Sequence, residues 1–186
     1  MISKNREGYL IARYSEIPLY LIQPFIEGYV FECMDTRPYK LFDAMEESYP
    51  LFRRWFYEKI IPELGKKNAT REVFFILEKS KKTDVENLSG FAILKKTGHE
   101  KKICSFRIAP RARMRGYAYE LFQACFDYLD TSNPILTIPS TIKDDFHGIL
   151  DRYKFQLMEE RPNYYVEGEV EYVFNGYLRD DSVNRI

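Results

Sequence analysis

The stretch from Ile103 to Ala118 most constrains how this chain can fold, because it predicts a strand that leads directly into a helix. An apolar run ends at Pro110, arginines follow at alternate positions, and Gly116 stands before a helical pattern. Free N–H groups and the positive end of the dipole at a helix N-terminus favour an anion, and arginines suit phosphate oxygens. The arginines are Arg111, Arg113 and Arg115. The stretch therefore predicts a nucleotide-type phosphate site, although such a turn taken alone is more often a solvated helix cap.

The residues after this stretch predict two helices separated by a strand. Apolar residues recur at helical spacing from Ala118 to Leu129, so we expect a helix over about 116–130, stopped by Thr131 to Pro134. Ile135 to Ile138 reads as a short strand. A second helix then starts at a capping box, Thr141 to Asp144. Its apolar stripe consists of Phe146, Ile149, Leu150 and Tyr153.

Strand patterns lie on both sides of this unit. Three apolar runs before it, at 73–77, 90–95 and 103–108, are separated by polar turns and predict an antiparallel meander. After it, 161–174 reads as two strands joined by a turn at 166–169. Near the N-terminus, 9–26 reads as one or two further strands. The order is then three strands, a helix, a strand, a helix and two strands.

The sequence Arg113-Met-Arg-Gly116-Tyr-Ala118 resembles the signature Gln/Arg-x-x-Gly-x-Gly/Ala of the GNAT superfamily of acyl-coenzyme A dependent N-acetyltransferases. Ile108-Ala-Pro110 matches the run that precedes the signature, and the resemblance covers about residues 72–176. It implies an α/β fold with a mixed, mostly antiparallel sheet of six or seven strands, flanked by helices on both faces. It also implies a splay between the fourth and fifth family strands, which end here at Ile108 and Ile138.

The resemblance implies that acetyl coenzyme A is the cosubstrate, and the spacing of cysteines and histidines predicts no metal. Backbone groups after the splay would pair with the pantetheine arm, and an N–H near Ile108 would polarise the thioester carbonyl. Many members have glycine where this chain has Met114, which predicts a stiffer loop. The expected cofactor contacts are Ile108, Ala109, Arg113, Met114, Arg115, Gly116, Tyr117 and Ala118.

Catalytic residues are harder to assign because the chain departs from the family pattern. The segment 149–155 is similar to the helix end Leu-Tyr-Glu-Lys-Leu-Gly-Phe, but Leu150 replaces the tyrosine that often protonates the leaving thiolate, and Lys154 replaces the glycine. Tyr153 and Tyr164 are equally good candidates for the acid that protonates the thiolate, and Tyr165 or a water molecule is the alternative. For each tyrosine, a packed position in the core is the simpler expectation. We expect Tyr164 and Tyr165 to lie on a strand.

The general base is equally open. Lys101 and Lys102 stand where the histone-acetylating branch has a glutamate. Glu78 or Glu100 could act through water, although each is more often a solvated charge. His147 has a suitable ordinary pKa, but a surface or capping role is the simpler expectation.

We therefore expect an N-acetyltransferase that acts on a primary amine of a small molecule or protein. The alternative is a noncatalytic coenzyme A binding sensor or interaction module. Equal totals of 28 basic and 28 acidic residues argue against nucleic acid or an anionic membrane as a partner. Cys33, Cys104 and Cys125 show neither disulfide nor metal spacing, which favours a cytoplasmic protein. We expect Cys104 and Cys125 to be packed side chains. A homodimer is a further expectation.

The length of 186 residues favours one domain over 1–186. We divide it into a substrate-side part at 1–71, a cofactor-binding core at 72–176 and a tail at 177–186. Within the first part, the sequence predicts a helix from Asp35 to Glu47 and a second, aromatic-rich helix from Phe52 to about Ile61, with Pro50 between them.

Overall fold

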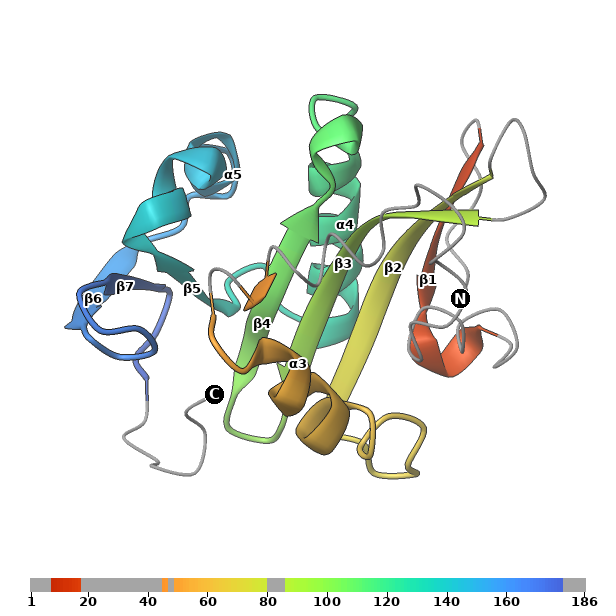
Figure 1. The fold of residues 1–186 in the computed structure, drawn as a ribbon, viewed down its shortest axis with the longest axis horizontal. Helices are drawn as coiled ribbons and strands as arrows, with labels where there is room; N and C mark the ends of the chain where they lie inside the picture. Colours follow the sequence, from red (N-terminus) through yellow and green to blue (C-terminus); the bar gives the residue numbers. More distant parts are fainter. Residues whose placement is uncertain (1–7, 18–44, 47–48, 80–85, 179–186) are drawn as a thin grey trace.

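The computed structural model describes residues 8–17, 45–46, 49–79 and 86–178, which form a seven-stranded sheet in the order β1-β2-β3-β4-β5-β7-β6 (Figure 1). Neighbouring strands are antiparallel except β4 and β5, which are parallel. This confirms the expected mixed sheet. The strands are β1 (Tyr9–Arg13), β2 (Arg71–Lys79), β3 (Glu86–Lys96), β4 (Lys101–Ile108), β5 (Ile135–Pro139), β6 (Leu157–Pro162) and β7 (Val170–Phe174).

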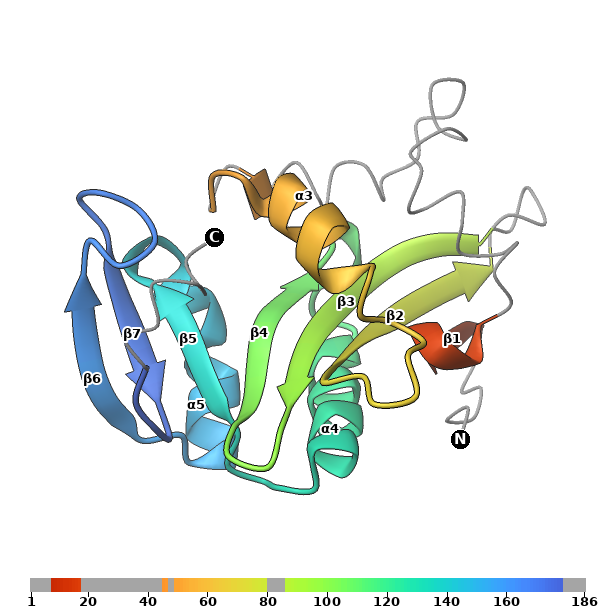
Figure 2. The ribbon, with the colours of Figure 1, turned by 90° about the horizontal axis from the view of Figure 1, so that it is seen from below.

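Helices cover both faces of the sheet, as expected (Figure 2). On one face lie α4 (Tyr117–Leu129) and α5 (His147–Tyr153), and on the other lies α3 (Phe52–Trp55), which continues as a π-helical turn, η2 (Phe56–Ile60). The helix predicted from Phe52 is therefore present. Ring contacts from Phe52 to Phe91 on the α3 side and from Phe122 to Phe106 on the α4 side fix the helices to the sheet.

Helix α4 follows the predicted periodicity closely. It begins after Gly116 and ends before Asp130, and both of these flanking residues adopt left-handed backbone angles. Its inward stripe is wider than expected, because Tyr117 and Phe126 are also buried. Full burial of Cys125 raises the pKa of its thiol and fits the expected role as a packed side chain.

The predicted capping box at Thr141 is wrong. A 3-10 helix, η4 (Ser140–Phe146), starts directly after Pro139, and among the described residues no side chain caps it. Thr141 thus lies inside the turn instead of ahead of it, so its hydroxyl cannot cap the helix start. The α-helical part begins only at His147.

The turn expected at 166–169 is longer than predicted. β6 ends at Pro162, which has no N–H to donate to a further ladder bond, and the connection to β7 runs over 163–169. Tyr164 and Tyr165 therefore lie in this connection and not on a strand, which corrects the expectation. The amide of Gly168 donates to the side chain of Asn163 at 2.6 Å and closes the connection.

Two N-terminal predictions are only partly covered by the described residues. The strand expected over 9–26 is present as β1, followed by a 3-10 turn, η1 (Tyr14–Glu16), while 18–26 lies outside the described residues. The helix expected from Asp35 to Glu47 lies outside them except for Met45 and Glu46, which are helical. Of the expected tail, 179–186 also lies outside.

The predicted splay between β4 and β5 is confirmed. The two strands pair only at Lys102 with Ile135 and at Ile103 with Leu136. β4 then continues to Ile108, and β5 continues to Pro139. A register shift against β3 leaves Cys104 between the paired residues Ile103 and Ser105. The sheet consequently opens toward the C-terminal ends of these parallel strands.

Candidate active site

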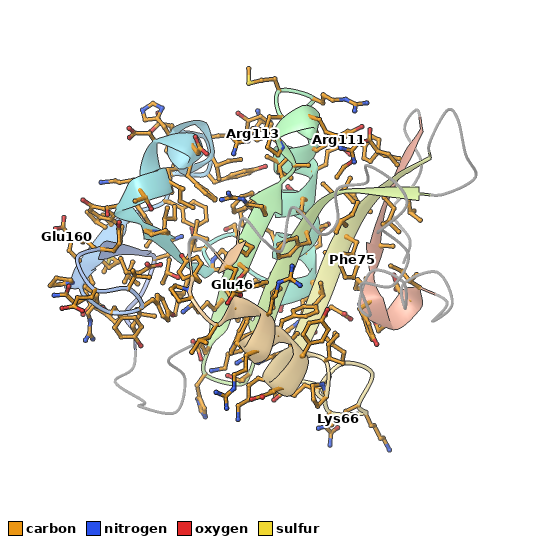
Figure 3. The ribbon with its side chains drawn as sticks, viewed as in Figure 1. Glu46, Lys66, Phe75, Arg111, Arg113 and Glu160 are labelled. Carbon is orange, nitrogen blue, oxygen red and sulfur yellow. The ribbon has the colours of Figure 1, made fainter. Side chains whose placement is uncertain are left out.

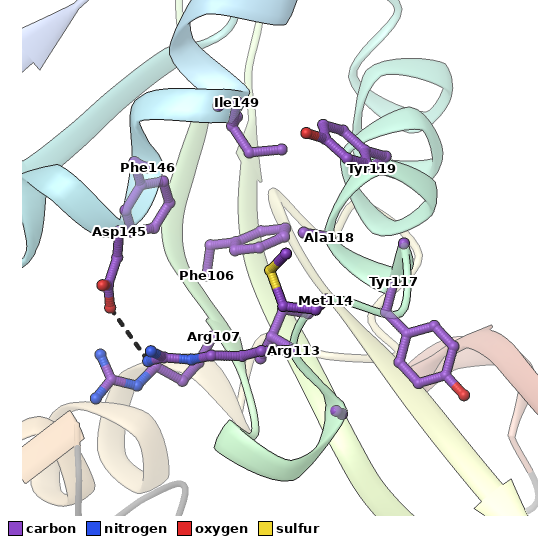
Figure 4. A pocket seen from close by; sticks show the side chains of 14 residues that line it. Phe106, Arg107, Arg113, Met114, Tyr117, Ala118, Tyr119, Asp145, Phe146 and Ile149 are labelled. Carbon is purple, nitrogen blue, oxygen red and sulfur yellow. Dashed lines mark ion pairs between the residues drawn. The ribbon is translucent and has the colours of Figure 1, made fainter.

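A pocket of about 530 Å³ occupies the opening between β4 and β5 (Figure 4). One wall is the end of β4, from Phe106 to Ile108. The connection from Ala112 to Met114 and the first turn of α4 form a second wall, and the segment from Asp145 to Ile149 forms the third. Its rings and aliphatic side chains make an apolar lining, and the charged side chains of Arg107, Arg113 and Asp145 lie together on one side (Figure 4). This is the usual composition of a site for a small molecule or cofactor.

Gly116 shapes the N-terminus of α4 through its backbone angle. Its φ of 83° lies in the left-handed region, and none of the described atoms lies within 4 Å of a Cβ built at this position. The protein itself therefore leaves this side open, and the glycine is required here by its backbone conformation. Met114 also has a positive φ, of 60°, and its side chain is fully exposed. The position where many family members have glycine is thus a left-handed one.

The three arginines that the sequence grouped together are separated in space. Only Arg113 lines the pocket, where it pairs with Asp145 at 3.1 Å. Arg115 lies 2.6 Å from a carboxylate oxygen of Glu78, and Arg111 donates to the carbonyl oxygen of Leu88 at 3.2 Å and lies 3.7 Å from Glu78. Figure 3 shows Arg111 and Arg113 near the same end of the sheet. One arginine therefore serves the pocket, and two hold the connection to the sheet.

Glu78 is buried, so the interpretation as a solvated charge is wrong. It accepts hydrogen bonds from the hydroxyls of Tyr117, at 2.6 Å, and of Ser89. Burial raises the pKa of Glu78, but these bonds and the charges of Arg115 and Arg111 together bring the pKa below its ordinary value. Burial and the bond to Glu78 raise the pKa of Tyr117 to about 12. The ring of Tyr117 accordingly points away from the other labelled side chains in Figure 4.

Most of the expected cofactor contacts lie around the pocket. Those that line it are Ile108, Arg113, Met114, Gly116, Tyr117 and Ala118. Ala109 is buried and donates its N–H to the carbonyl oxygen of Ser89 at 2.9 Å, and Arg115 is held by Glu78. Tyr119 also lines the pocket, and sequence reasoning missed it. Its place in the first turn of α4, directly after the loop, was the available signal.

Neither candidate tyrosine for the acid lines this pocket. The hydroxyl of Tyr153 donates to the carbonyl oxygen of Tyr119 at 3.3 Å, and its ring packs between α4 and α5. Tyr164 stacks edge-on against Tyr165 in the β6–β7 connection, with ring centroids 4.6 Å apart. Lys154 adopts a left-handed φ of 56° as it ends α5, which explains why the family prefers glycine at that position.

The other candidates for a base are engaged at the surface or in ion pairs. The ring of His147 is 79% exposed and lies 3.1 Å from Asp151, which fits the surface role. Glu100 pairs with Lys95 at 2.5 Å. A second, smaller cavity on the α3 side of the sheet contains Tyr49, Thr137 and Cys104 in its wall. Sequence reasoning missed this cavity, and it also missed the buried Glu171 behind it.

Solved structures with the same arrangement of strands and helices identify the fold. A protein from Desulfovibrio desulfuricans assigned to the GNAT family of acetyltransferases superposes with a TM-score of 0.56 at 12% identity, over 90% of this chain and 97% of that one. The chain has the GNAT fold. The ribosomal-protein-S18-alanine N-acetyltransferase of Escherichia coli gives 0.55 at 13% identity, over 92% and 97% of the two chains. Arabidopsis thaliana NAA60, in complex with acetyl-CoA, gives 0.55 at 12% identity, over 88% and 96%.

The resemblance drawn from the residues around Gly116 is thus confirmed at the level of the fold. The sequence matches no protein-family model, and a search of curated proteins finds no similar sequence. Within the described part of the chain, no group of three or more histidine, cysteine or acidic residues could hold a metal ion. In that same part, no helix is long and apolar enough to cross a membrane.

Proposed function

We propose that the chain is an N-acetyltransferase that transfers the acetyl group of acetyl coenzyme A to a primary amine of a small molecule or a protein. The observation that carries this proposal is the pocket of about 530 Å³ between the freed edge of β4 and the first turn of α4. An extended, anionic cofactor needs both features. The shared fold with acetyltransferases, one of them in complex with acetyl-CoA, supports the same reaction class.

The pocket residues fit each part of this cofactor. β4 stops pairing with β5 after Ile103, so backbone groups from Phe106 to Ile108 are available to pair with an extended pantetheine arm. The N-terminus of α4 and Arg113 would bind the pyrophosphate, with Met114 to Ala118 forming the cradle. When bound, the cofactor supplies the thioester whose acetyl group is transferred.

Cofactor binding is tested by calorimetric titration with coenzyme A, using wild type, Gly116→Trp and the control Gly65→Trp. Both glycines have positive φ and open surroundings, so the two variants carry similar backbone strain, but only Gly116 lines the pocket. We expect Gly116→Trp to lose binding and Gly65→Trp to keep it. No heat from wild type at millimolar ligand, which corresponds to binding weaker than about −4 kcal/mol, contradicts the proposal.

A noncatalytic coenzyme A binding module is the second candidate, because Tyr153 does not line the pocket, its hydroxyl is bonded to the backbone carbonyl of Tyr119, and Leu150 replaces the family tyrosine. Amine-dependent release of free thiol from acetyl coenzyme A separates the two functions. If the chain is an enzyme and one of our candidate acids is correct, Tyr153→Phe or Tyr164→Phe lowers turnover by roughly 10²-fold, the usual effect of removing a proton donor. Tight cofactor binding without thiol release supports the module.

A further inference from the structure

The smaller cavity lies directly beside the large pocket. Phe106, Arg107 and Phe146 line both of them, so the two meet at the splay between β4 and β5. The smaller one measures about 20 Å³, which is room for one group the size of a water molecule or an amine nitrogen. A nitrogen placed there would therefore lie next to the large pocket, at the side that the two cavities share.

Two residues of this cavity wall have hydroxyl groups with a common acceptor. Tyr49 and Thr137 line it, and both donate hydrogen bonds to Glu171 on β7. The Tyr49 bond measures 3.1 Å, and the side chains of Tyr49 and Glu171 are both buried. The carboxylate thus lies one hydrogen bond behind the cavity and is reached through a hydroxyl.

The position of Tyr49 is fixed by the segment that precedes α3. Its amide donates to the carbonyl oxygen of Met45 at 2.7 Å. The carboxylate of Glu46 accepts hydrogen bonds from the amides of Leu51, at 2.9 Å, and Arg53, at 2.8 Å, and so caps the start of α3. Figure 3 shows Glu46 on the α3 side of the sheet.

Charged groups of both signs act on this pair. Lys102 of β4 is buried and lies within hydrogen-bonding range of the Tyr165 hydroxyl, at 3.4 Å. The charge of Lys102 acts on Glu171, and that of Arg107 acts on Tyr49. Tyr165 and Glu169, both from the β6–β7 connection, also act on the pair, and Cys104 stands in the cavity wall.

We propose that this cavity receives the acceptor nitrogen, and that the Tyr49 hydroxyl takes a proton from the ammonium group while it passes its own proton to Glu171. This inference rests on the proposed acetyl transfer. The neutral amine then forms the new N–C bond to the acetyl carbon as the C–S bond breaks, the second amine proton neutralises the departing thiolate, and Glu171 returns its proton to solvent. The overall products are the amide, free coenzyme A and one proton.

The protonation properties of both groups suit such a relay. Burial raises the pKa of Glu171 to about 7, although the bonds from Tyr49 and Thr137 and the charge of Lys102 lower it. A group with a pKa near neutrality is an efficient proton acceptor at that pH. Burial, together with the charge of Glu171, raises the pKa of Tyr49 well above its ordinary value. Tyr49 therefore exchanges protons without becoming a stable tyrosinate.

The acceptor carboxylate selects the class of amine. A carboxylate whose pKa lies near 7 takes a proton more readily from a weakly basic ammonium group than from a strongly basic one. An α-amino group has a pKa of about 7.7–8.0 and a lysine-type amine about 10.4, so their neutral fractions near pH 7 differ by a few hundredfold. The structure thus favours an α-amine, such as a peptide N-terminus, over a polyamine.

The experiment measures thiol release against pH with two probes, an alanine-terminated peptide amide and spermidine. In wild type we expect kcat for the peptide to rise through a pKa of about 7 as Glu171 ionises. Glu171→Gln and Tyr49→Phe should each lower kcat by roughly 10²-fold, and Glu171→Gln should also remove this limb of the profile. Glu171→Asp should restore part of the rate. The control Glu160→Gln removes the same charge from an exposed residue of β6 (Figure 3). It should leave kcat and the pH profile unchanged.

Two further readouts keep this inference separate from the proposed function. Infrared difference spectra of the free wild-type protein should show a carboxyl group titrating near pH 7 that is absent in Glu171→Gln, and coenzyme A should bind both proteins equally. Three results would each overturn the relay while acetyl transfer stands. They are a missing carboxyl titration in wild type, an unchanged pH profile in Glu171→Gln, and faster turnover of spermidine than of the peptide. Cofactor binding without thiol release for either probe overturns both.

Discussion

Replacing Glu78 with glutamine should destabilise the protein by about 2–4 kcal/mol at pH 7. Glu78 joins β2 to the start of β3 through Ser89, to the first turn of α4 through Tyr117, and to the cofactor connection through Arg115. Glutamine keeps the shape of the side chain but removes its charge. In the wild type, the hydroxyls of Ser89 and Tyr117 each donate to a carboxylate oxygen of Glu78. In the variant an NH2 group replaces one of these oxygens, so one of the two buried hydroxyls loses its acceptor.

The magnitude follows from the partners. A hydrogen bond to a charged group contributes about 1.5–3 kcal/mol, and a buried group left without a partner costs a further 1–3 kcal/mol or so. The side chain of Arg115 is half exposed, so its ion pair adds only about 0–1 kcal/mol. Part of the loss is recovered because the glutamine oxygen still accepts one bond, which gives the range stated above.

The pH dependence provides a second check of the same reasoning. The pKa of Glu78 is lowered in the folded state, so its stabilisation is complete above the ordinary carboxyl pKa and is lost as the pH falls through the folded value. Urea unfolding should therefore show a large difference between wild type and Glu78→Gln at pH 7 that shrinks in acid. Glu58→Gln, which removes an exposed partner of Arg54, should cost less than about 1 kcal/mol. A loss below about 1 kcal/mol for Glu78→Gln, or a difference independent of pH, refutes the argument.

Two further predictions concern glycine positions, and both are measured by urea unfolding. Gly116→Ala places a Cβ on a residue with a φ of 83° and should destabilise the protein by about 1–2 kcal/mol. Met114→Gly removes an exposed side chain from a residue with positive φ and should change the stability by less than about 1 kcal/mol. Equal losses for the two variants contradict this prediction. Gly90→Ala brings a Cβ to 2.9 Å from the Arg107 carbonyl oxygen and should cost about 1–3 kcal/mol, while Gly98→Ala, which has open surroundings, should cost less than about 0.5 kcal/mol. A silent Gly90→Ala is the contrary result.

The sequence predicts the parts of the fold that local periodicity determines. The helical spacing from Ala118 to Leu129 places α4 within one residue at each end, because one apolar face must pack on the sheet. The apolar runs before it predict β2, β3 and β4 because each forms a strand of the buried centre of the sheet. The splay was available only through the family resemblance, since a single sequence contains no signal for where two parallel strands stop pairing.

The electrostatic network around the site could not be predicted in the same way. Glu78 and Tyr117 are 39 residues apart, and Glu171 and Tyr49 are 122 apart, so their burial depends on tertiary packing. Acidic residues are usually exposed, and that general tendency favoured the wrong interpretation of Glu78. The three arginines at alternate positions also looked equivalent in sequence, yet the turn geometry from Pro110 to Gly116 sends only Arg113 to the pocket.

The interruption of pairing between β4 and β5 connects these features physically. Beyond Ile103, β4 has no β5 partner, so its backbone faces the large pocket while Phe106 and Arg107 reach both cavities. The width of such an opening would vary unless each of its two sides were held in place separately. Glu78 ties the β3 side to α4, and Glu171 ties β7 beside β5 to the segment before α3. The two buried carboxylates therefore stabilise opposite sides of one gap. The pKa of Glu78 is lowered, whereas that of Glu171 is raised toward neutrality, so only Glu171 can exchange a proton near pH 7.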